Sequence, residues 1–363
     1  MTRFLFIGPD HPTAGGGREQ LSHLHRRALG ELLGERLDTF LLPRRPLAGV
    51  AALRAVINGR IDGTDQGTEE RILSHIGDRS INCVWLDGSN LGVLARAIKR
   101  EFPKVEVTTF FHNVEPRFFL GALRPRPGLR TLGVVFATYL AERMAVRASD
   151  RRIALNERDS NLLRRLYGRS ATDLLPMAVP SSSKFAGVTS AAPVEGDYLL
   201  FVGGGFYANL SGILWFARHV APRLSLPTLI VGRGLGALAA ELEKSPNICV
   251  VGEVDDLSPF YRHATAVVAP IFDGSGMKTK VAESLMHGKR VIGTHEAFTG
   301  YGAMDAGALC NTPNEFVAAI GALYAARPPL FDPRLRELYE ANFSPAALKA
   351  RLRMIVFAPR KSG

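Results

Sequence analysis

Residues 270–288 decide the fold and read Pro-Ile-Phe-Asp-Gly-Ser-Gly-Met-Lys-Thr-Lys-Val-Ala-Glu-Ser-Leu-Met-His-Gly. An apolar, β-branched run over residues 264–271 leads into this stretch and predicts a buried strand. Gly274 and Gly276 then predict a tight turn, because glycine adopts backbone conformations that other residues avoid. A helical pattern follows the turn directly. A strand, a glycine-rich turn and a helix in this order are typical of one unit of an α/β sheet.

The same turn has the composition of an anion-binding site. Glycines allow the backbone to approach a ligand, and the amides at the start of a helix point toward it. Lys278 and Lys280 add positive charge there, and Glu283 lies three residues further along the same helix face. We expect the two phosphates of a nucleoside diphosphate to bind at Gly274, Ser275, Gly276, Met277, Lys278 and Lys280. Glu283 either accepts hydrogen bonds from the ribose hydroxyls or forms an ordinary surface pair with Lys280.

Strand and helix patterns alternate along the rest of the chain, which predicts parallel sheets covered by helices. Strands are expected at residues 4–7, 37–42, 82–86, 105–111, 152–155, 198–202, 228–231, 248–251, 266–271 and 290–293. Residues 180–196 interrupt the alternation with small residues and two prolines, as a linker does. The chain therefore predicts two Rossmann-like α/β domains that face a central cleft.

The domain boundaries follow from this interruption. We expect an N-terminal domain over residues 1–180, a linker over 181–196 and a second domain over 197–332. A helix is predicted over residues 333–355, and the segment 333–363 is expected to pack back on the first domain.

Composition limits the classes of partner. The chain carries 45 lysines and arginines against 34 acidic residues, a net charge of +11, which suits nucleotides, anionic lipid headgroups or nucleic acid. Scattered arginines on solvated faces also explain this charge. The three cysteines form no CxxC pair, which argues against a zinc or redox site and for a reducing compartment. No apolar run reaches the length of a membrane span, so we expect a cytoplasmic protein.

The stretch 274–288 resembles the Gly-x-Gly-x-Arg-x-Lys-x-x-Glu-Ala…Gly motif of family 4-like glycosyltransferases of the GT-B fold, the glycosyl transferases group 1. Lys278 takes the arginine position, Lys280 the lysine position and Glu283 the glutamate position. Weaker landmarks follow in the order of the family at residues 156–159, 175–179, 201–203 and 231–234. The resemblance therefore covers nearly the whole chain.

The resemblance implies the transfer of a hexose from a UDP- or GDP-linked donor to a hydroxyl group, a reaction of EC class 2.4. It implies retention of the anomeric configuration without a metal ion, and no cofactor besides the donor. The resemblance also implies that the leaving diphosphate helps to deprotonate the sugar acceptor. By the same resemblance, the acceptor is a glycan or a lipid-linked sugar of bacterial surface polysaccharide or glycolipid assembly.

The chain departs from the family at two places. Many relatives carry a second glutamate where this chain has Ser275, two positions after Asp273. The region around Gly204 also lacks the two cations with which many relatives hold the donor phosphates. Gly204 and Arg233, each after a strand, are expected to complete the donor site, and the phosphate contacts fall to Arg233 and the two motif lysines.

The first domain supplies further candidates. Gly15, Gly16 and Gly17 separate a strand from a helix, so the amides of Gly16 and Gly17 are expected to face the diphosphate, unless they only form a tight turn. His112 follows a strand, and residues at that end of parallel strands line the crevice of an open α/β sheet. We predict catalytic roles for His112, Lys280 and Glu283, with His112 orienting the sugar acceptor or the transferred sugar. The alternative for His112 is a hydrogen bond that caps the strand.

Residues 116–152 contain eight arginines among aromatic and aliphatic residues. Exposed, they predict a peripheral contact with anionic membrane, at the inner face of the membrane. The alternative is a helix pair with a buried apolar face.

Two other functions remain open at the level of the sequence. A nucleotide-sugar 2-epimerase of the same fold uses the same donor site but needs no sugar acceptor. A non-catalytic protein that binds nucleotides or nucleic acid also suits the positive charge, although no nucleic-acid-binding module is recognisable, so no nucleic acid is expected.

Overall fold

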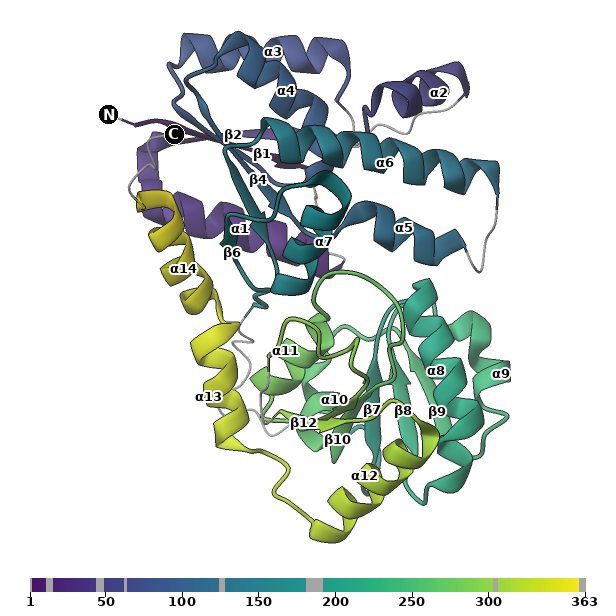
Figure 1. Ribbon diagram of the computed structural model, residues 1–363. Coiled ribbons are helices and arrows are strands. Elements are labelled where there is room, and N and C mark those ends of the chain that lie inside the picture. Colours follow the sequence, from purple (N-terminus) through teal and green to yellow (C-terminus); the bar gives the residue numbers. More distant parts are fainter. Residues whose placement is uncertain are drawn as a thin grey trace. The chain divides into compact units, whose positions relative to one another are not determined.

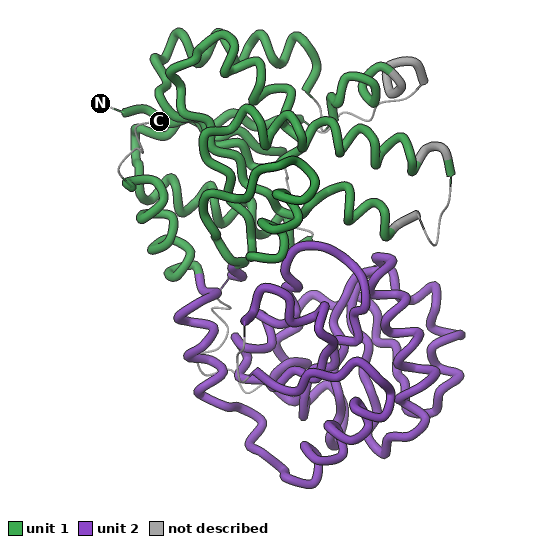
Figure 2. The backbone as a smooth tube through the Cα atoms, viewed as in Figure 1, with its two compact units in different colours: residues 1–177, 345–363 green, residues 178–344 purple. Residues whose placement is uncertain are grey.

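The computed structural model describes residues 2–10, 16–43, 49–61, 64–123, 128–180, 192–302 and 306–358. The chain divides into two compact units, which Figure 2 draws in different colours. Unit 1 contains residues 1–177 and 345–363, and unit 2 contains residues 178–344. Each unit has its own six-stranded parallel sheet with helices packed around it (Figure 1). The predicted α/β fold with two parallel sheets is confirmed.

The sheet of unit 1 has the strand order β2-β1-β3-β4-β5-β6. Its strands are β1 (Phe4–Pro9), β2 (Leu37–Leu42), β3 (Cys83–Leu86), β4 (Glu106–Phe111), β5 (Arg151–Ala154) and β6 (Asp173–Leu174). Its helices are α1 (Gly17–Leu33), α2 (Gly49–Asn58), α3 (Gln66–Asp78), α4 (Gly92–Glu101), α5 (Glu115–Leu123), α6 (Leu129–Ala148), α7 (Glu157–Tyr167) and α14 (Pro345–Phe357). The chain proceeds from β1 to β2 on one side and later to β3 on the other. Such a reversal leaves a crevice at the carboxyl ends of the strands.

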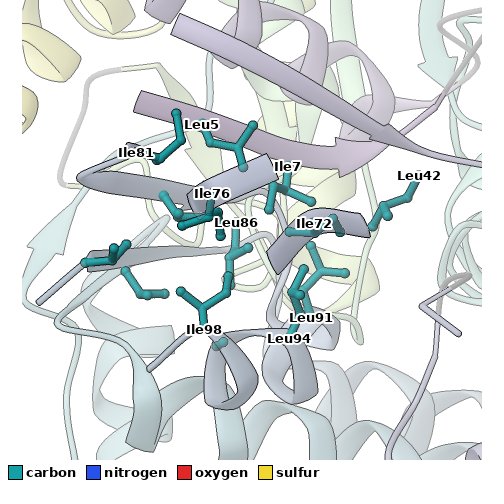
Figure 3. Close-up of a cluster of buried hydrophobic side chains, with 14 residues drawn as sticks. Leu5, Ile7, Leu42, Ile72, Ile76, Ile81, Leu86, Leu91, Leu94 and Ile98 are labelled. Atoms are coloured by element: carbon teal, nitrogen blue, oxygen red, sulfur yellow. The ribbon is translucent and has the colours of Figure 1, made fainter. Parts of the chain in front are cut away.

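An aliphatic core holds α3 and α4 on this sheet, as Figure 3 shows. Leu5, Ile7 and Leu86 of the strands pack against Ile76 of α3 and Leu94 of α4. Fully burying one such side chain contributes roughly 1.5–3 kcal/mol. The cluster therefore fixes the strand ends at which the loops of the site begin.

The sheet of unit 2 has the order β12-β11-β10-β7-β8-β9. Its strands are β7 (Leu199–Val202), β8 (Thr228–Val231), β9 (Ile248–Gly252), β10 (Ala266–Ala269), β11 (Val291–Gly293) and β12 (Gly307–Leu309). Its helices are α8 (Tyr207–His219), α9 (Ala239–Leu242), α10 (Ser258–His263), α11 (Thr279–Met286), α12 (Pro313–Ala326) and α13 (Pro333–Asn342). The order reverses between β7 and β10, so the loops after these two strands border the crevice of this sheet.

The end of the chain differs from the prediction. The expected single helix over 333–355 is wrong, because α13 ends at Asn342 and α14 begins at Pro345. Proline lacks a backbone donor and is tolerated only in the first turn of a helix, so Pro345 starts a new one. α14 belongs to unit 1, where Lys349 pairs with Glu31 of α1 at 2.8 Å. Residues 181–191 of the expected linker lie outside the described residues.

Within the described ranges, no helix combines the length and the apolarity that crossing a bilayer requires.

Candidate functional site

The glycine-rich turn of unit 2 joins β10 to α11 and is closed by its own lysine. Gly274 and Gly276 have φ angles of 129° and 65°, in the region that favours glycine. The Nζ atom of Lys278 lies 3.2 Å from the carbonyl oxygen of Ser275 and 3.4 Å from that of Gly276. The same ammonium group lies 2.9 Å from the carboxylate of Glu296. Lys278 therefore faces a carboxylate and holds the turn in shape.

A tyrosine fixes the start of α11 to this turn. The hydroxyl of Tyr301 donates to the carbonyl oxygen of Lys278 at 2.6 Å and accepts from the amide of Ala282 at 3.3 Å. Tyr301 is 2% exposed, so burial makes both hydrogen bonds costly to break. The first turn of the helix is therefore held rigidly, as an anion site at a helix start requires.

Lys280 is the buried cation of the site. Its side chain is 6% exposed, and its Nζ atom donates to Oδ1 of Asn209 at 2.8 Å. The same atom lies 4.3 Å from the centre of the Phe201 ring. Burial lowers the pKa of Lys280 to about 7, Glu283 opposes this change, and Lys278 adds to it. An anion beside Lys280 favours the charged form, because an opposite charge raises the pKa of an amine.

Glu283 is partly buried and held by α10. Its Oε2 atom accepts a hydrogen bond from the hydroxyl of Tyr261 at 2.9 Å. Burial raises the pKa of Glu283, while the Tyr261 hydroxyl and Lys280 oppose that rise. The Tyr261 ring stacks on His287 with the ring centres 4.6 Å apart. Glu283 is thus held by a hydrogen bond from α10 and is not an ordinary surface residue.

Two glycine runs pack against each other beside this helix. The amide of Gly205 donates to the carbonyl oxygen of Arg233 at 2.7 Å. A Cβ atom at Gly232 would lie 2.0 Å from the carbonyl oxygen of Gly203, so only glycine fits there. Gly204 is exposed, and a Cβ atom there would lie 3.7 Å from its nearest neighbour. The two backbones are therefore tightly packed beside α11.

Asn209 connects the two glycine runs to α11. Its Nδ2 atom donates to the carbonyl oxygen of Gly204 at 3.0 Å, while its Oδ1 atom accepts from Lys280. The loop after β7 contains no cation of its own, and no sequence motif indicates Asn209. Lys280 brings the cation to that loop through Asn209, a contact between residues 71 positions apart.

Arg233 has a different environment from the motif lysines. Its side chain is 71% exposed and lies 2.8 Å from the carboxylate of Glu253. The backbone of Arg233 packs with the two glycine runs. Its guanidinium group, however, forms an ion pair with Glu253 at the surface. An exposed pair of this kind contributes about 0–1 kcal/mol, so Arg233 can exchange partners at little cost.

In unit 1, a side chain of α1 caps the glycine run that precedes this helix. α1 begins at Gly17, and the amide of Gly16 donates to the carboxylate of Glu19 at 3.0 Å. An acidic side chain thus takes one of the amides that were expected to face a diphosphate. Gly15 lies outside the described residues.

His112 follows β4 and belongs to a buried polar cluster. It is 4% exposed, and its Nε2 atom lies 3.2 Å from Oδ2 of Asp87. Asp87 follows β3, so both side chains lie at the carboxyl ends of neighbouring strands. Burial lowers the pKa of His112, and the Asp87 carboxylate opposes this change. The ring is therefore held by a carboxylate, a partner that the sequence analysis did not identify.

Glu115, three residues after His112, begins α5 and is 4% exposed. Its carboxylate lies 3.5 Å from the guanidinium group of Arg18 in the first turn of α1. Its amide donates to Glu142 of α6 at 3.1 Å. A buried acid beside Glu115 was not expected, and burial followed by the charge of Glu115 raises the pKa of Glu142 to about 8.

The family comparison matches a large part of unit 2. Residues 196–326 match the family model described as glycosyl transferases group 1. These residues include the turn, both motif lysines and both glycine runs. No curated protein matches the sequence.

Solved structures match over almost the full length at low identity. Sucrose-phosphate synthase from Thermosynechococcus elongatus is 14% identical, with a TM-score of 0.71 and coverage of 98% of both chains. HepE from Anabaena, determined in complex with UDP, is 12% identical with a TM-score of 0.67 and coverage of 99% of this chain and 100% of that one. The lipopolysaccharide outer core galactosyltransferase WaaB is 13% identical with a TM-score of 0.63, over 98% of this chain and 99% of that one.

The structural comparison and the family comparison establish different properties. At these identities the solved structures establish the GT-B fold, with two parallel-sheet units. The family match establishes a glycosyl transferases group 1 domain over residues 196–326. The resemblance that the motif indicated is therefore confirmed.

Proposed function

We propose that this chain, a nucleotide-sugar-dependent glycosyltransferase with a group 1 domain, binds the donor diphosphate at residues 274–278 and the start of α11. One observation carries the proposal: among the described residues, the buried Lys280 has a single, neutral hydrogen-bonding partner, Asn209, and its pKa is about 7. A lysine ammonium group has three N–H donors. A bound diphosphate supplies the negative charge and the oxygen atoms that a buried ammonium group needs.

Departure of the diphosphate is the step that this site assists. When the bond between the sugar and the phosphate breaks, negative charge grows on the diphosphate. Lys280 and the amides of the rigid first turn of α11 stabilise that charge where it develops, and such preorganised groups contribute most to catalysis. Lys278 shares its charge with Glu296 and mainly keeps the turn in shape. Glu283 is the candidate acceptor for the ribose hydroxyls.

Within unit 1, the proposed substrate-binding groups are His112 and the amide of Gly17, because the amide of Gly16 is taken by Glu19. His112 contacts the transferred sugar or the hydroxyl of the sugar acceptor. Support comes from its place at the carboxyl end of β4, where ligands of open α/β sheets bind. Gly17, at the first position of α1, offers a helix-start amide for an anionic group of the substrate, with the charge of Arg18 beside it.

We propose a UDP-linked hexose as donor and a glycan or lipid-linked sugar of a bacterial surface polysaccharide or glycolipid as acceptor. The donor proposal is supported by the fold shared with HepE, whose structure contains UDP. The acceptor proposal is supported by the fold shared with a lipopolysaccharide galactosyltransferase. Retention of the anomeric configuration belongs to the same proposal.

Calorimetric titration tests the donor site. UDP is titrated into the parent chain, Lys280→Ala and the control Lys244→Ala, which alters an exposed lysine of the same unit. We expect binding by the parent and the control, and a loss of about 100-fold or more in affinity for Lys280→Ala. Equal affinity in all three would overturn the proposal. GDP in parallel titrations decides the base, and release of an epimer from a UDP-sugar without any acceptor would assign the chain to the 2-epimerases.

We also propose that unit 1 touches an anionic membrane through α2, α5 and α6. α5 and α6 run side by side (Figure 1), and both carry exposed apolar side chains, with α2 adjacent to α6. Leu120, Leu132, Phe136 and Ile57 are each more than half exposed, at 52%, 52%, 53% and 61%. Arg117, Arg143 and Arg147 lie on the same helices, whereas Arg124 and Arg126 lie outside the described residues. Helices that carry both exposed apolar side chains and arginines suit anionic headgroups.

Sedimentation with vesicles of phosphatidylglycerol tests this contact. Phe136→Glu should reduce the bound fraction several-fold, because it removes buried apolar area and adds like charge. The control is Leu166→Glu, which changes a 39% exposed leucine on α7 of the same unit. Equal binding of both variants and the parent would remove α6 from the proposed surface.

A further inference from the structure

Asp87 is a fully buried carboxylate that accepts hydrogen bonds from three side chains. It accepts hydrogen bonds from the hydroxyl of Ser22, from Nδ1 of His25 at 3.0 Å and from Nε2 of His112 at 3.2 Å. Ser22 and His25 both come from α1, so the helix that begins at Gly17 holds this acid in place. A buried charge is tolerated when it is hydrogen-bonded from several sides.

The charges within this cluster determine which atom of His112 carries the proton. Burial disfavours the ionised form of Asp87, but His112 and His25 outweigh it and hold the pKa of Asp87 well below its ordinary value. Burial also lowers the pKa of His112; Asp87 opposes this, and the charges of Arg18 and His25 add to it. At neutral pH the cluster therefore contains a carboxylate and a neutral His112 ring.

A neutral imidazole has one N–H donor and one nitrogen that accepts. Because a carboxylate only accepts hydrogen bonds, the nitrogen that faces Asp87 must be the donor, which is Nε2. The edge of Phe110 packs against the same ring, with the ring centres 4.7 Å apart, and limits its rotation. Among the described residues, Nδ1 of His112 has no hydrogen-bonding partner.

We infer that Asp87 is a positioning residue that holds His112 as the Nε2–H tautomer, so that Nδ1 accepts a hydrogen bond from a sugar hydroxyl of the substrate. The inference rests on the proposed role of His112 in sugar transfer and specifies that role. His112 then aligns a hydroxyl group as a neutral hydrogen-bond acceptor and does not act as an acid. That hydroxyl belongs either to the transferred sugar or to the sugar acceptor.

The tautomer can be measured without any substrate. Two-dimensional ¹⁵N–¹H spectra of histidine side chains distinguish a protonated Nε2 from a protonated Nδ1, and His112→Gln identifies the signals of this ring. We expect His112 of the parent chain to be neutral and protonated at Nε2 at pH 7.5. In Asp87→Asn the side-chain amide can donate to Nε2, so we expect the proton to move to Nδ1. A parent ring protonated at Nδ1 would overturn the inference even if the variant fails to fold.

Kinetics of the same variants test the consequence. Asp87→Asn should lower kcat on the order of 100-fold, the scale of a misaligned reacting group, while the KM for the donor changes less than about threefold. Asp38→Asn is the matched control, because Asp38 in β2 of the same unit also binds a histidine, His75, at 3.1 Å. That variant should retain the parent kcat. A parent-like kcat for a folded Asp87→Asn would refute the role of Asp87.

Two further comparisons separate the possible failures. If His112→Gln slows transfer but leaves donor hydrolysis unchanged, the hydroxyl belongs to the sugar acceptor; equal losses assign it to the transferred sugar. If Lys280→Ala abolishes UDP binding while Asp87→Asn and His112→Gln transfer sugar like the parent, this inference fails and the proposed function stands. If Lys280→Ala binds UDP like the parent, the proposed donor site fails, and the spectra still report on the Asp87–His112 pair.

Discussion

The two ends of α11 carry two buried lysines that differ in what surrounds them. Lys280, at the start, is 6% exposed and donates to one side-chain amide. Lys289, just after the end, is 2% exposed and donates to three backbone carbonyl oxygens, those of Arg262, Ala264 and Leu330. Burial brings the pKa of each to about 7. A lowered pKa alone therefore does not distinguish a ligand site from a structural lysine, whereas the number of satisfied donors does.

The largest expected contrast is in activity. Lys280→Met should lower kcat/KM for sugar transfer on the order of 1000-fold, because it removes a preorganised charge from the leaving diphosphate. Lys289→Met should leave kcat/KM per folded molecule within about threefold, since its donors are taken up by backbone. Initial rates with a verified donor, normalised to folded protein, measure both values. Equal losses in the two variants would erase the distinction between the two helix ends.

Stability should change in the opposite sense. Lys289→Met should lower the free energy of unfolding at pH 7 by about 3 kcal/mol, because three buried carbonyl groups each lose a donor. Lys280→Met should stay within about 1 kcal/mol of the parent or exceed it, because a buried cation is replaced by an apolar side chain of similar length. Urea unfolding followed by circular dichroism gives both values. A strongly destabilised Lys280→Met would indicate a structural lysine at this end too.

UDP binding should depend on pH through Lys280. Its pKa is about 7 in the free chain, and a bound anion raises it, so binding takes up a proton above pH 7. Affinity should therefore fall as pH rises from 7, by at most about tenfold per pH unit. Calorimetry in two buffers with different ionisation enthalpies counts the protons. Lys280→Met should show neither proton uptake nor this pH dependence, whereas Lys289→Met should keep both.

The smallest expected effect concerns the support of Glu283. Tyr261→Phe removes the hydroxyl that donates to Glu283 and should lower kcat by about tenfold or less, the equivalent of one hydrogen bond to a charged group. The matched control is Tyr198→Phe, because the Tyr198 hydroxyl donates to the backbone carbonyl of Phe260 at 2.8 Å in the same unit. Steady-state rates decide the comparison, and indistinguishable variants would leave Glu283 without a supporting role for Tyr261.

The sequence was sufficient for the architecture and for the turn that begins α11. Both depend on local patterns, namely apolar strands, glycine spacing and helix starts. The contacts of the site are not local. Lys280 meets Asn209 71 positions away, and Lys278 meets Glu296 18 positions away, because a parallel sheet brings distant loops to one edge. No spacing rule predicts such pairs.

Some features left a signal that sequence reasoning passed over. Asp87 directly follows a buried strand, as His112 does. A polar residue at that position is therefore an equally good candidate for a site residue. Pro345, within the expected helix over 333–355, should have indicated a second helix start. The occupation of the Gly16 amide by Glu19 could be anticipated from their spacing of three, which is typical of a helix cap.

The contact between Gly203 and Gly232 also limits how this enzyme can be altered. A Cβ atom at Gly232 would overlap the backbone of Gly203, so no larger residue fits there. A change of sugar preference therefore cannot begin with a substitution at this contact. Gly204 differs, because a Cβ atom at that position would make an ordinary contact, 3.7 Å from the carbonyl oxygen of Arg233. A directed-evolution library aimed at donor preference should therefore randomise Gly204 and leave its two tightly packed neighbours, Gly203 and Gly232, fixed.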